Sequence, residues 1–383
     1  MYNNHEVKAI NADKKTVTVT SIFENQTQDY EYDKLILSSG VRPNSLPVPG
    51  KELSNVFLMR GYNWATKIKN KLEDPEVKKV AVIGAGYIGI EAAVAFCKSG
   101  KEVTLLDIID RPLGTYLDKK MTDILENHLK EKGINVLTGS KISAFVGDEK
   151  VNAIKTEKEE ISVDLVVQAA GVKANTEWLR GTVDVDDHGW ILTNEYLQTS
   201  LSDVYAVGDA TLAYSIPARA KIPLALATVA RREARYVVKH LFEKVPSKPF
   251  GGVVGSSALS VFDYHFATSG LNSSTAEKLG ITVDSVYYED MIRPKYVPEQ
   301  HGNTKVFVQL FFDQMTHQIL GGAILSTYDI TAQGNIIALA VQQKLTIEDL
   351  AEADFFFQPG FNRQWNVLNL TAQKALGEEL FTE

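Results

Sequence analysis

A glycine-rich stretch near residue 84 has the residue types and the spacing that bind a dinucleotide. Its glycines stand at 84, 86 and 89, after the apolar run 79–83 and before a stretch of helical periodicity that reaches about Ser99. Gly84, Gly86 and Gly89 would allow a tight turn, let a pyrophosphate approach the backbone and permit close helix packing. Asp107 ends the next apolar run and can accept hydrogen bonds from an adenosine ribose. The spacing predicts a dinucleotide site over 79–107 that prefers NADH to NADPH.

A second candidate site follows another apolar run. Gly208 and Asp209 come directly after residues 204–207, at the position where open α/β sheets bind their ligands. Asp209 could accept hydrogen bonds from a polyol such as the ribityl chain of a flavin. It could also cap the next helix, which is the interpretation that the residues alone favour.

Other reactive residue types give no sign of a site. Cys97 is the single cysteine and stands in helical register with Ile90 and Val94, which predicts a small buried side chain rather than a redox centre. A single cysteine excludes a disulfide framework and fits a reducing compartment, so we expect a cytoplasmic protein. The seven histidines are scattered without metal-ligand spacing, so no metal site is expected.

An internal repeat indicates how the elements around these sites are organised. Asp33, Gly40 and Asn44 recur with the same spacing as Asp164, Gly171 and Asn175, an offset of 164 − 33 = 131. Two related nucleotide-binding units are therefore predicted. The glycine turn at 84 belongs to the second copy, and its equivalent in the first copy falls at 84 − 131 = −47, before the first residue. We expect the first unit to be truncated at its N-terminus.

The predicted fold class is α/β, with two Rossmann-like nucleotide-binding domains and a C-terminal α+β domain. The domains are expected at 1–47 with 172–249 for the truncated one, at 48–171 for the one with the glycine turn, and at 250–383 for the C-terminal one. The expected elements are an antiparallel meander from about 14 to 32 and a buried strand at 35–37, helices at 62–72, 225–241, 331–343 and 346–353, and a hairpin of 306–312 with 318–325.

Composition narrows the class of protein. The 383 residues are 44% hydrophobic and 23% charged, which is typical of a globular chain of two or three domains. The formal net charge of −8 and the lack of a basic block argue against a nucleic-acid partner. The N-terminus lacks the features of a signal peptide. No membrane span is expected, because the longest apolar run, 80–97, contains Glu91 and three glycines.

An aromatic tract near the C-terminus has two interpretations. Phe355, Phe356, Phe357 and Phe361 are followed by Trp365. Core packing is the default for such residues. A subunit interface is the next alternative, because aromatic side chains crowded near a terminus often pack against a partner.

Together these residues resemble the NADH peroxidase and NADH oxidase group of flavin-dependent pyridine-nucleotide oxidoreductases. The resemblance covers essentially the whole chain and is most specific at 33–40, 57–61, 82–91, 107–119, 206–212 and 353–359. Two stretches, 111–119 and 208–212, are most similar to NADH peroxidase. Water-forming oxidases typically carry Cys-Ala after the Gly-Asp pair, where this chain has Ala210 and Thr211.

The resemblance also implies which residues bind the two cofactors. Its NADH contacts correspond to Gly84, Gly86, Ile88, Gly89, Asp107, Tyr116, Gly171 and Ala258, although the peroxidase pattern has glycine at the last position. Its FAD contacts correspond to Ser38, Ser39, Gly40, Val41, Arg60, Gly208, Asp209, Leu226, Ala227 and Thr228. The family's C-terminal domain forms a homodimer, which favours the interface interpretation of the aromatic tract.

The chemistry that the resemblance implies needs a cysteine that alternates between thiolate and sulfenic acid, beside a histidine. Both belong to an N-terminal segment that this chain does not contain, so no catalytic residue is assigned within it. The expected function is an FAD-dependent NADH peroxidase that reduces hydrogen peroxide to water, here truncated and without activity. The alternatives are a water-forming NADH oxidase with oxygen as acceptor, a CoA-disulfide reductase, and a catalytically silent NADH-binding fragment.

Overall fold

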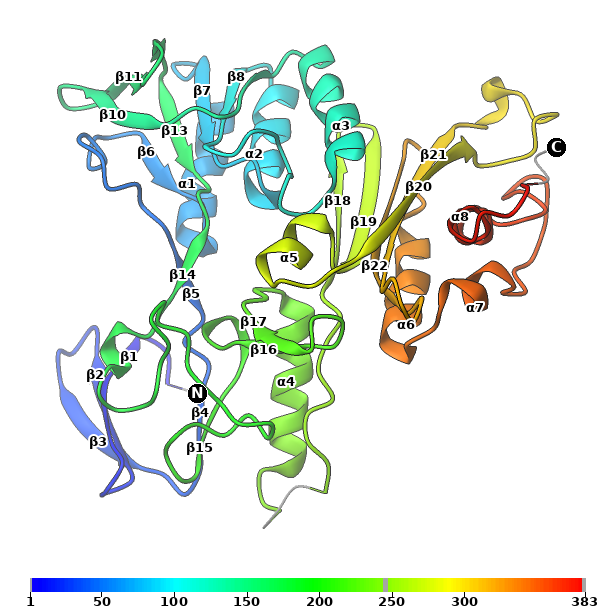
Figure 1. The fold of residues 1–383 in the computed structure, drawn as a ribbon. Coiled ribbons are helices and arrows are strands. Elements are labelled where there is room, and N and C mark those ends of the chain that lie inside the picture. The colour runs from blue at the N-terminus through cyan, green and yellow to red at the C-terminus, as the bar shows by residue number, and fades with distance from the viewer. Residues whose placement is uncertain (1, 244–246, 381–383) are drawn as a thin grey trace. The chain divides into compact units, whose positions relative to one another are not determined.

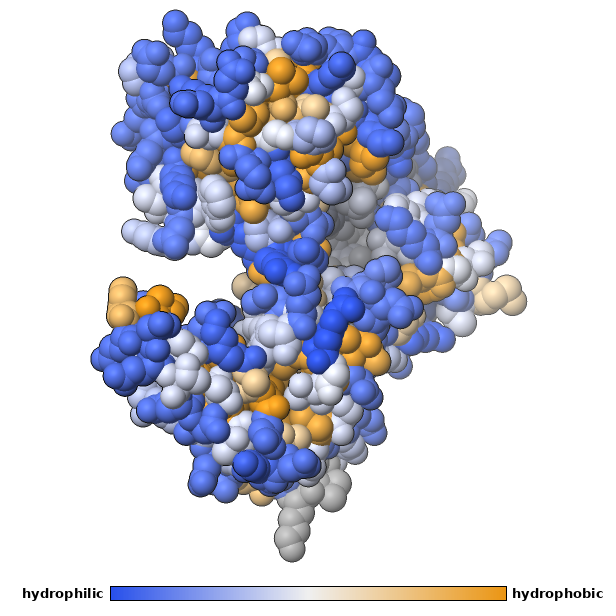
Figure 2. Space-filling model, turned by 90° about the vertical axis from the view of Figure 1, so that its left-hand side faces the viewer, coloured by the Kyte–Doolittle hydropathy of each residue, from blue (hydrophilic) through white to orange (hydrophobic). Residues whose placement is uncertain are grey.

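A computed structural model describes residues 2–243 and 247–380 and divides the chain into two compact units. The first unit comprises residues 1–42 and 172–255, and the second comprises 43–171 and 256–383. Within the described ranges, no helix is both long enough and apolar enough to cross a membrane. Figure 2 shows a mostly hydrophilic face with scattered apolar areas, as on most folded proteins.

The second unit is built on a parallel sheet (Figure 1), and the glycine turn directly follows one of its strands. Its strand order is β6 (Val56–Leu58), β13 (Leu165–Gln168), β7 (Lys79–Ile83), β8 (Glu102–Leu106) and β9 (Asn135–Leu137). The connections between its strands contain the helices α1 (Gly61–Glu73), α2 (Tyr87–Lys98) and α3 (Lys119–Glu131). A small antiparallel sheet follows in the chain and is made of β10 (Ile142–Gly147), β11 (Val151–Thr156) and β12 (Glu160–Ser162). The order β13-β7-β8 places the glycine turn at the centre of the sheet.

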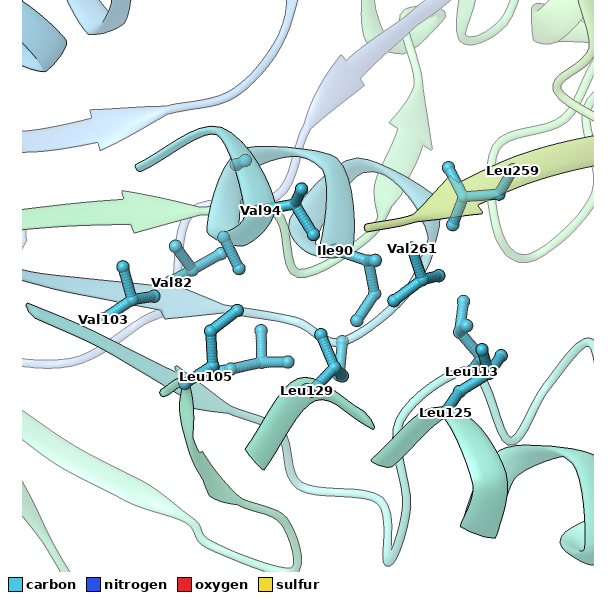
Figure 3. Packing of buried hydrophobic residues seen from close by; sticks show 14 of the residues in the cluster. Val82, Ile90, Val94, Val103, Leu105, Leu113, Leu125, Leu129, Leu259 and Val261 are labelled. Carbon is cyan, nitrogen blue, oxygen red and sulfur yellow. The ribbon is translucent and has the colours of Figure 1, made fainter. Parts of the chain in front are cut away.

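An antiparallel sheet makes up the rest of the second unit. Its order is β18 (Ser256–Val261), β19 (Tyr264–Gly270), β22 (Ile319–Ser326), β21 (Lys305–Phe312) and β20 (Asp284–Met291), with helices α5 (Ser273–Lys278), α6 (Gly334–Gln343), α7 (Ile347–Ala351) and α8 (Val367–Ala375). Leu259 and Val261 of β18 pack with Ile90 of α2 in one buried cluster (Figure 3). The two sheets of this unit therefore share a hydrophobic core.

The first unit begins with an antiparallel meander of β1 (His5–Asn11), β2 (Thr16–Ser21) and β3 (Thr27–Glu31). Strands β2 and β3 lie within the predicted range of about 14 to 32, whereas β1 precedes it and was not predicted. The unit also contains a parallel pair, β4 (Leu35–Leu37) with β15 (Val204–Ala206), and an antiparallel pair, β16 (Ala213–Ser215) with β17 (Ala220–Ile222). Its one long helix among the described residues is α4 (Ala227–His240). A further pair, β5 (Val41–Pro43) with β14 (Val172–Ala174), lies at the boundary of the units.

Candidate functional site

The glycine turn between β7 and α2 has a geometry that only glycine can adopt at two positions. Gly84 has a φ of +103°, and a Cβ there would lie 2.4 Å from the carbonyl oxygen of Ala169. A Cβ on Gly89 would lie 1.7 Å from the carbonyl oxygen of Gly84. Helix α2 begins after Gly86, and no described side chain caps it. The N–H groups of its first turn are therefore left for an external anion such as a pyrophosphate.

Asp107 holds this turn in place. Its Oδ2 accepts a hydrogen bond from the backbone N–H of Ala85 at 2.6 Å, and its Oδ1 accepts one from Ile109 at 3.1 Å. Each carboxylate oxygen has a second lone pair, so Asp107 can still accept hydrogen bonds from ribose hydroxyls. The residue predicted to bind the ribose thus also positions the turn that would bind the pyrophosphate.

Two tyrosines stand beside the turn. A Cβ on Gly86 would lie 3.7 Å from the ring of Tyr116, which places this predicted NADH contact next to the turn. The rings of Tyr116 and Tyr87 have their centroids 4.2 Å apart in an edge arrangement. The Tyr87 hydroxyl forms a 2.7 Å hydrogen bond with the hydroxyl of Ser257, and burial raises the pKa of Tyr87. Sequence reasoning missed Tyr87 and Ser257.

The remaining predicted NADH residues lie around this centre in the second unit. Ile88 is in the first turn of α2 and 36% exposed. Ala258 is exposed in β18, next to Ser257. Gly171 follows β13 with a φ of +81°, and its carbonyl oxygen accepts a 3.0 Å hydrogen bond from the N–H of Asn44. The structure thus brings most of the predicted dinucleotide residues to one end of the parallel sheet.

The first unit gathers several predicted flavin contacts. A Cβ on Gly208 would lie 3.3 Å from the Cβ of Ala230 in α4 and 3.9 Å from the hydroxyl of Ser38. No described side chain caps the start of α4, which is formed by Leu226, Ala227 and Thr228. The start of α4 and Ser38, which follows strand β4, therefore both lie beside the turn at Gly208.

The same region offers free polar groups that fit a flavin nucleotide. The Ser39 hydroxyl is buried and has no hydrogen-bond partner among the described residues. Gly40 has a φ of +65° and open space where a Cβ would be. A hydroxyl donor and helix N–H groups are suited to phosphate and carbonyl oxygens. Val41 follows in β5, whereas Arg60 belongs to the second unit, so its predicted flavin contact stays a prediction.

Asp209 does not cap the next long helix. It lies in a short 3-10 helix, Gly208–Ala210, whereas α4 begins only at Ala227. The helix-cap interpretation that the residues favoured is therefore wrong for α4.

Glu233 is a buried carboxyl group that the sequence analysis did not single out. Its Oε2 accepts a 2.7 Å hydrogen bond from the N–H of Gly208, and the side chain is fully buried. Its Oε1 has no hydrogen-bond partner among the described residues. Burial raises the pKa of Glu233 to about 7, and the nearby Asp209 adds to this effect. The sequence does contain a signal for this buried charge, because Val229, Glu233 and Val237 share one helical face and only Glu233 is charged.

Cys97 and the aromatic tract depart from their simplest interpretations. Cys97 is only half-buried, and its thiol donates a 3.3 Å hydrogen bond to the carbonyl oxygen of Lys132. Phe356 is 73% exposed and Phe361 is 61% exposed, so the core interpretation is wrong for these two side chains. Among the described residues, no group of three or more histidine, cysteine, aspartate or glutamate side chains could hold a metal ion.

Comparison with known proteins decides the family. The family model for the pyridine nucleotide-disulphide oxidoreductases matches residues 1–234, and the model for their dimerisation domain matches residues 256–367. The chain belongs to the pyridine nucleotide-disulphide oxidoreductase family. This membership confirms the predicted fold class, with Rossmann-like nucleotide-binding domains and a C-terminal dimerisation domain. It also confirms the expected cofactors, FAD and NADH, and supports a homo-oligomer.

Individual relatives agree with this membership. An NADH oxidase of Enterococcus faecalis is 41% identical over 374 residues, which are 97% of this chain and 82% of the relative. The structure of a water-forming NADH oxidase from Lactobacillus brevis bound to NADH superimposes with a TM-score of 0.93 at 34% identity, covering 98% of this chain and 82% of that one. A more distant relative, 30% identical over 90% of this chain and 76% of its own length, is an NAD(P)H coenzyme A polysulfide/persulfide reductase of Pyrococcus horikoshii.

Proposed function

We propose that this protein is a flavoenzyme that oxidises NADH and passes the electrons to oxygen. The observation that carries the proposal is the turn at Gly84–Gly89, where an uncapped helix start, the turn-holding Asp107 and two tyrosines lie together in an arrangement suited to a dinucleotide. The choice of oxygen is supported by the relatives at 41% and 34% identity, both of which are NADH oxidases.

In this proposal the residues of the second unit bind and orient NADH. The backbone N–H groups at the start of α2 hold the pyrophosphate, and the Asp107 carboxylate accepts hydrogen bonds from the adenosine ribose while it fixes the turn. The negative charge of Asp107 disfavours the 2′-phosphate of NADPH. Tyr116 covers the turn at Gly86 and is supported by the ring of Tyr87.

In the first unit, the residues around Gly208 would hold FAD. The start of α4 supplies backbone donors, the Ser39 hydroxyl supplies an unused buried donor, and the Asp209 carboxylate is suited to the ribityl hydroxyls. Flavin chemistry at this site would supply hydride acceptance from NADH and electron transfer to the acceptor. Glu233 fixes the backbone of Gly208 and thereby positions the turn against which the flavin would lie.

Peroxide is the second candidate acceptor, favoured by the resemblance of residues 111–119 and 208–212 to NADH peroxidase. The two acceptors have different stoichiometries. Reduction of oxygen to water consumes two molecules of NADH and two protons per oxygen, whereas reduction of hydrogen peroxide consumes one NADH and one proton and releases two waters.

The test is a set of measurements on the purified chain supplied with FAD. The visible spectrum reports bound flavin, and the quenching of protein fluorescence reports NADH binding. We then expect NADH consumption that depends on oxygen and needs no added peroxide. A ratio of two NADH per oxygen marks reduction to water, and a ratio of one marks release of hydrogen peroxide. Consumption that requires added peroxide would transfer the assignment to the peroxidase, and consumption that requires coenzyme A disulfide or persulfide would transfer it to the reductases. A colourless protein that binds NADH without consuming it would contradict the proposal and support a silent NADH-binding fragment.

A further inference from the structure

The loop of residues 111–118 carries Tyr116 beside the glycine turn and is bonded to that turn at Leu113. Leu113 is fully buried and has a φ of +58°, a left-handed conformation that leucine rarely adopts. Its N–H donates a 2.8 Å hydrogen bond to the carbonyl oxygen of Ala85, and its carbonyl oxygen accepts one from the N–H of Tyr116 at 2.9 Å. Because the backbone at Leu113 is strained, the loop needs further contacts to keep this shape.

Asp118 supplies such contacts at the end of the loop. It directly precedes helix α3, a position where aspartate normally accepts hydrogen bonds from the first N–H groups of its own helix. Among the described residues, the Asp118 carboxylate caps no helix N–H. Its Oδ2 instead accepts hydrogen bonds from the Ser273 hydroxyl at 2.5 Å and the Gln309 side-chain amide at 3.1 Å, and its Oδ1 accepts the N–H of Ser273 at 3.3 Å. The carboxylate therefore ties the loop to α5 and β21 rather than to α3.

Asn272 holds the loop on the other side of Tyr116. It is buried and caps helix α5, where its Oδ1 accepts the N–H of Thr275 at 2.8 Å. Its Nδ2 donates a 3.0 Å hydrogen bond to the carbonyl oxygen of Thr115. Both halves of the side-chain amide are thus used, one for its own helix and one for the loop. Asn272 and its neighbour Ser273 together hold the loop before and after Tyr116.

These contacts affect the dinucleotide site because of where the Tyr116 ring lies. A Cβ on Gly86 would be 3.7 Å from this ring, and Gly86 directly precedes α2, whose first N–H groups are expected to bind the pyrophosphate. The ring also contacts Tyr87, with the two centroids 4.2 Å apart. A side chain that orients a ligand must be placed to within about 0.5 Å. A loop released from α5 and β21 would not hold the ring so closely.

We propose that Asp118 is a positioning residue for NADH, which acts through Tyr116 by tying its loop to Ser273 and Gln309. The inference rests on the NADH site of the proposed function and adds a residue that does not itself need to touch the nucleotide. A charged acceptor forms stronger hydrogen bonds with neutral donors than an uncharged acceptor does, which suits a carboxylate to this role. Through Asp118, the segment that matches the dimerisation-domain model takes part in NADH binding within the same chain.

Fluorescence titration of the full chain with NADH measures the effect of Asp118. Asp118→Ala removes all three hydrogen bonds, so we expect the dissociation constant for NADH to rise about tenfold. Asp118→Asn keeps one oxygen, which can accept from both Ser273 Oγ and Gln309 Nε2. This conservative variant should bring the constant back to within about threefold of that of the unaltered chain.

Asp263→Ala is the matched control. Asp263 lies between β18 and β19 and forms a 2.5 Å ion pair with Lys132, just beyond the C-terminal end of α3. It therefore joins the same helix to the same antiparallel sheet, but at the end of α3 that is remote from Tyr116. We expect this variant to bind NADH as the unaltered chain does. A rise in its dissociation constant equal to that of Asp118→Ala would overturn the proposal, because any contact between helix and sheet would then serve.

A double-variant cycle separates positioning from general stabilisation. In Tyr116→Ala there is no ring left to misplace, so the additional change Asp118→Ala should alter the dissociation constant for NADH by less than about twofold. If Asp118 only stabilised the fold, the second change would cost the same factor with or without the Tyr116 ring. Equal losses in the two backgrounds would therefore overturn the proposal.

Hydrogen exchange without NADH tests the tie itself. The amides of Tyr116 and Leu117 both donate to the carbonyl oxygen of Leu113, and both should exchange at least about tenfold faster in Asp118→Ala. Unchanged exchange there would overturn the proposal, as would faster exchange with an unchanged dissociation constant for NADH. An unaltered chain that binds no NADH would overturn the proposed function, and this inference with it. The two failures are distinguishable, because a failure of this inference alone leaves NADH binding by the unaltered chain intact.

Discussion

The carboxylate of Asp107 accepts the backbone N–H of Ala85 at 2.6 Å, across the 22 residues that separate the two ends of the strand–helix–strand unit. Ala85 is in the middle of the glycine turn, and Asp107 ends the next strand. The residue expected to select the ribose is therefore also the one that fixes the pyrophosphate-binding turn. We therefore expect Asp107 to couple cofactor selection to the geometry of the turn.

Substitution of Asp107 should separate these two roles. Asp107→Asn keeps one acceptor oxygen for the turn but removes the charge, so we expect NADPH binding to improve relative to NADH. Asp107→Ala removes both hydrogen bonds, each of which is worth about 1.5–3 kcal/mol for a charged acceptor, so NADH affinity should fall at least about tenfold. Dissociation constants for both nucleotides, from fluorescence titration, check this. If the affinities for NADH and NADPH fell equally in both variants, Asp107 would only support the turn and would not select the cofactor.

Two of the turn's glycines, Gly86 and Gly89, should respond differently to an added methyl group. Gly89→Ala would place a Cβ 1.7 Å from the Gly84 oxygen, so we expect a loss of about 1–3 kcal/mol in the free energy of unfolding. In Gly86→Ala the new Cβ meets only the Tyr116 ring at 3.7 Å, so the fold should be unaffected while NADH binds more weakly. Urea unfolding followed by NADH titration separates the two effects. A destabilised Gly86→Ala variant would contradict the geometry of the turn.

The hydrogen bond between Tyr87 and Ser257 should link helix α2 to the antiparallel sheet of the second unit. Tyr87→Phe and Ser257→Ala each remove one hydroxyl of this 2.7 Å contact, and each should lower the free energy of unfolding by about 1 kcal/mol. The double variant should cost little more than either single one, because both remove the same interaction. Additive losses in urea unfolding would mean that the two hydroxyls act independently.

Glu233 should make stability depend on pH. Its pKa is raised by burial from the ordinary 4.5 to about 7, so the folded state holds its proton more tightly than the unfolded state does. The folded state therefore loses stability as pH rises from about 4.5 to about 7, by roughly 3 kcal/mol at about 1.4 kcal/mol per pKa unit. The charges that face it are Asp209, which adds to the effect, and Lys221, which opposes it.

Glu233→Gln provides the control, because it keeps an acceptor for the N–H of Gly208 but cannot ionise. Relative to this variant, the unaltered chain should lose stability in urea between pH 5 and pH 8. If the difference in unfolding free energy between the two proteins were the same at both pH values, the Glu233 carboxyl would be ionised throughout, and its raised pKa would be wrong.

The exposed aromatic side chains should act between subunits. The combined substitution Phe356→Ser and Phe361→Ser removes side chains that are 73% and 61% exposed in the single chain, so it should leave the folded subunit intact and weaken the dimer at least about tenfold. Tyr62→Ser in α1 is the control, because this aromatic side chain is 84% exposed and lies outside the dimerisation domain. Sedimentation equilibrium measures the change. An unchanged dimer would place the interface elsewhere in the dimerisation domain.

Local patterns were sufficient to predict most of the elements near the site. The spacing of apolar residues predicted the strands at 79–83 and 35–37 and helix α4 to within about two residues. The positions of the glycines predicted the turn at 84–89. Gly84 has a positive φ, and the carbonyl oxygen of Gly84 lies too close to Gly89 for a side chain there, so neither position accepts another residue type. These features are determined by residues that are close together in the sequence, so a single sequence is enough to predict them.

Contacts between distant segments could not be predicted in this way. The partner of Tyr87 is Ser257, 170 residues away, and nothing at either position indicates the other. Glu233 gave a partial signal, because it is a charged residue on an apolar helix face. Its hydrogen bond to the backbone N–H of Gly208, 25 residues away, could not be predicted, because a backbone group is the same at every position of the sequence. Exposure of the aromatic tract depends on which surface the C-terminal sheet leaves uncovered, and residue type alone suggested burial.

NADH consumption by the chain supplied with FAD tests the central claim most directly. The absorbance of NADH and the oxygen concentration are recorded together, first without and then with added peroxide. The account predicts oxygen-dependent loss of NADH, which Asp107→Ala should slow at limiting NADH. A chain that binds both FAD and NADH yet leaves NADH unchanged with either acceptor would contradict it.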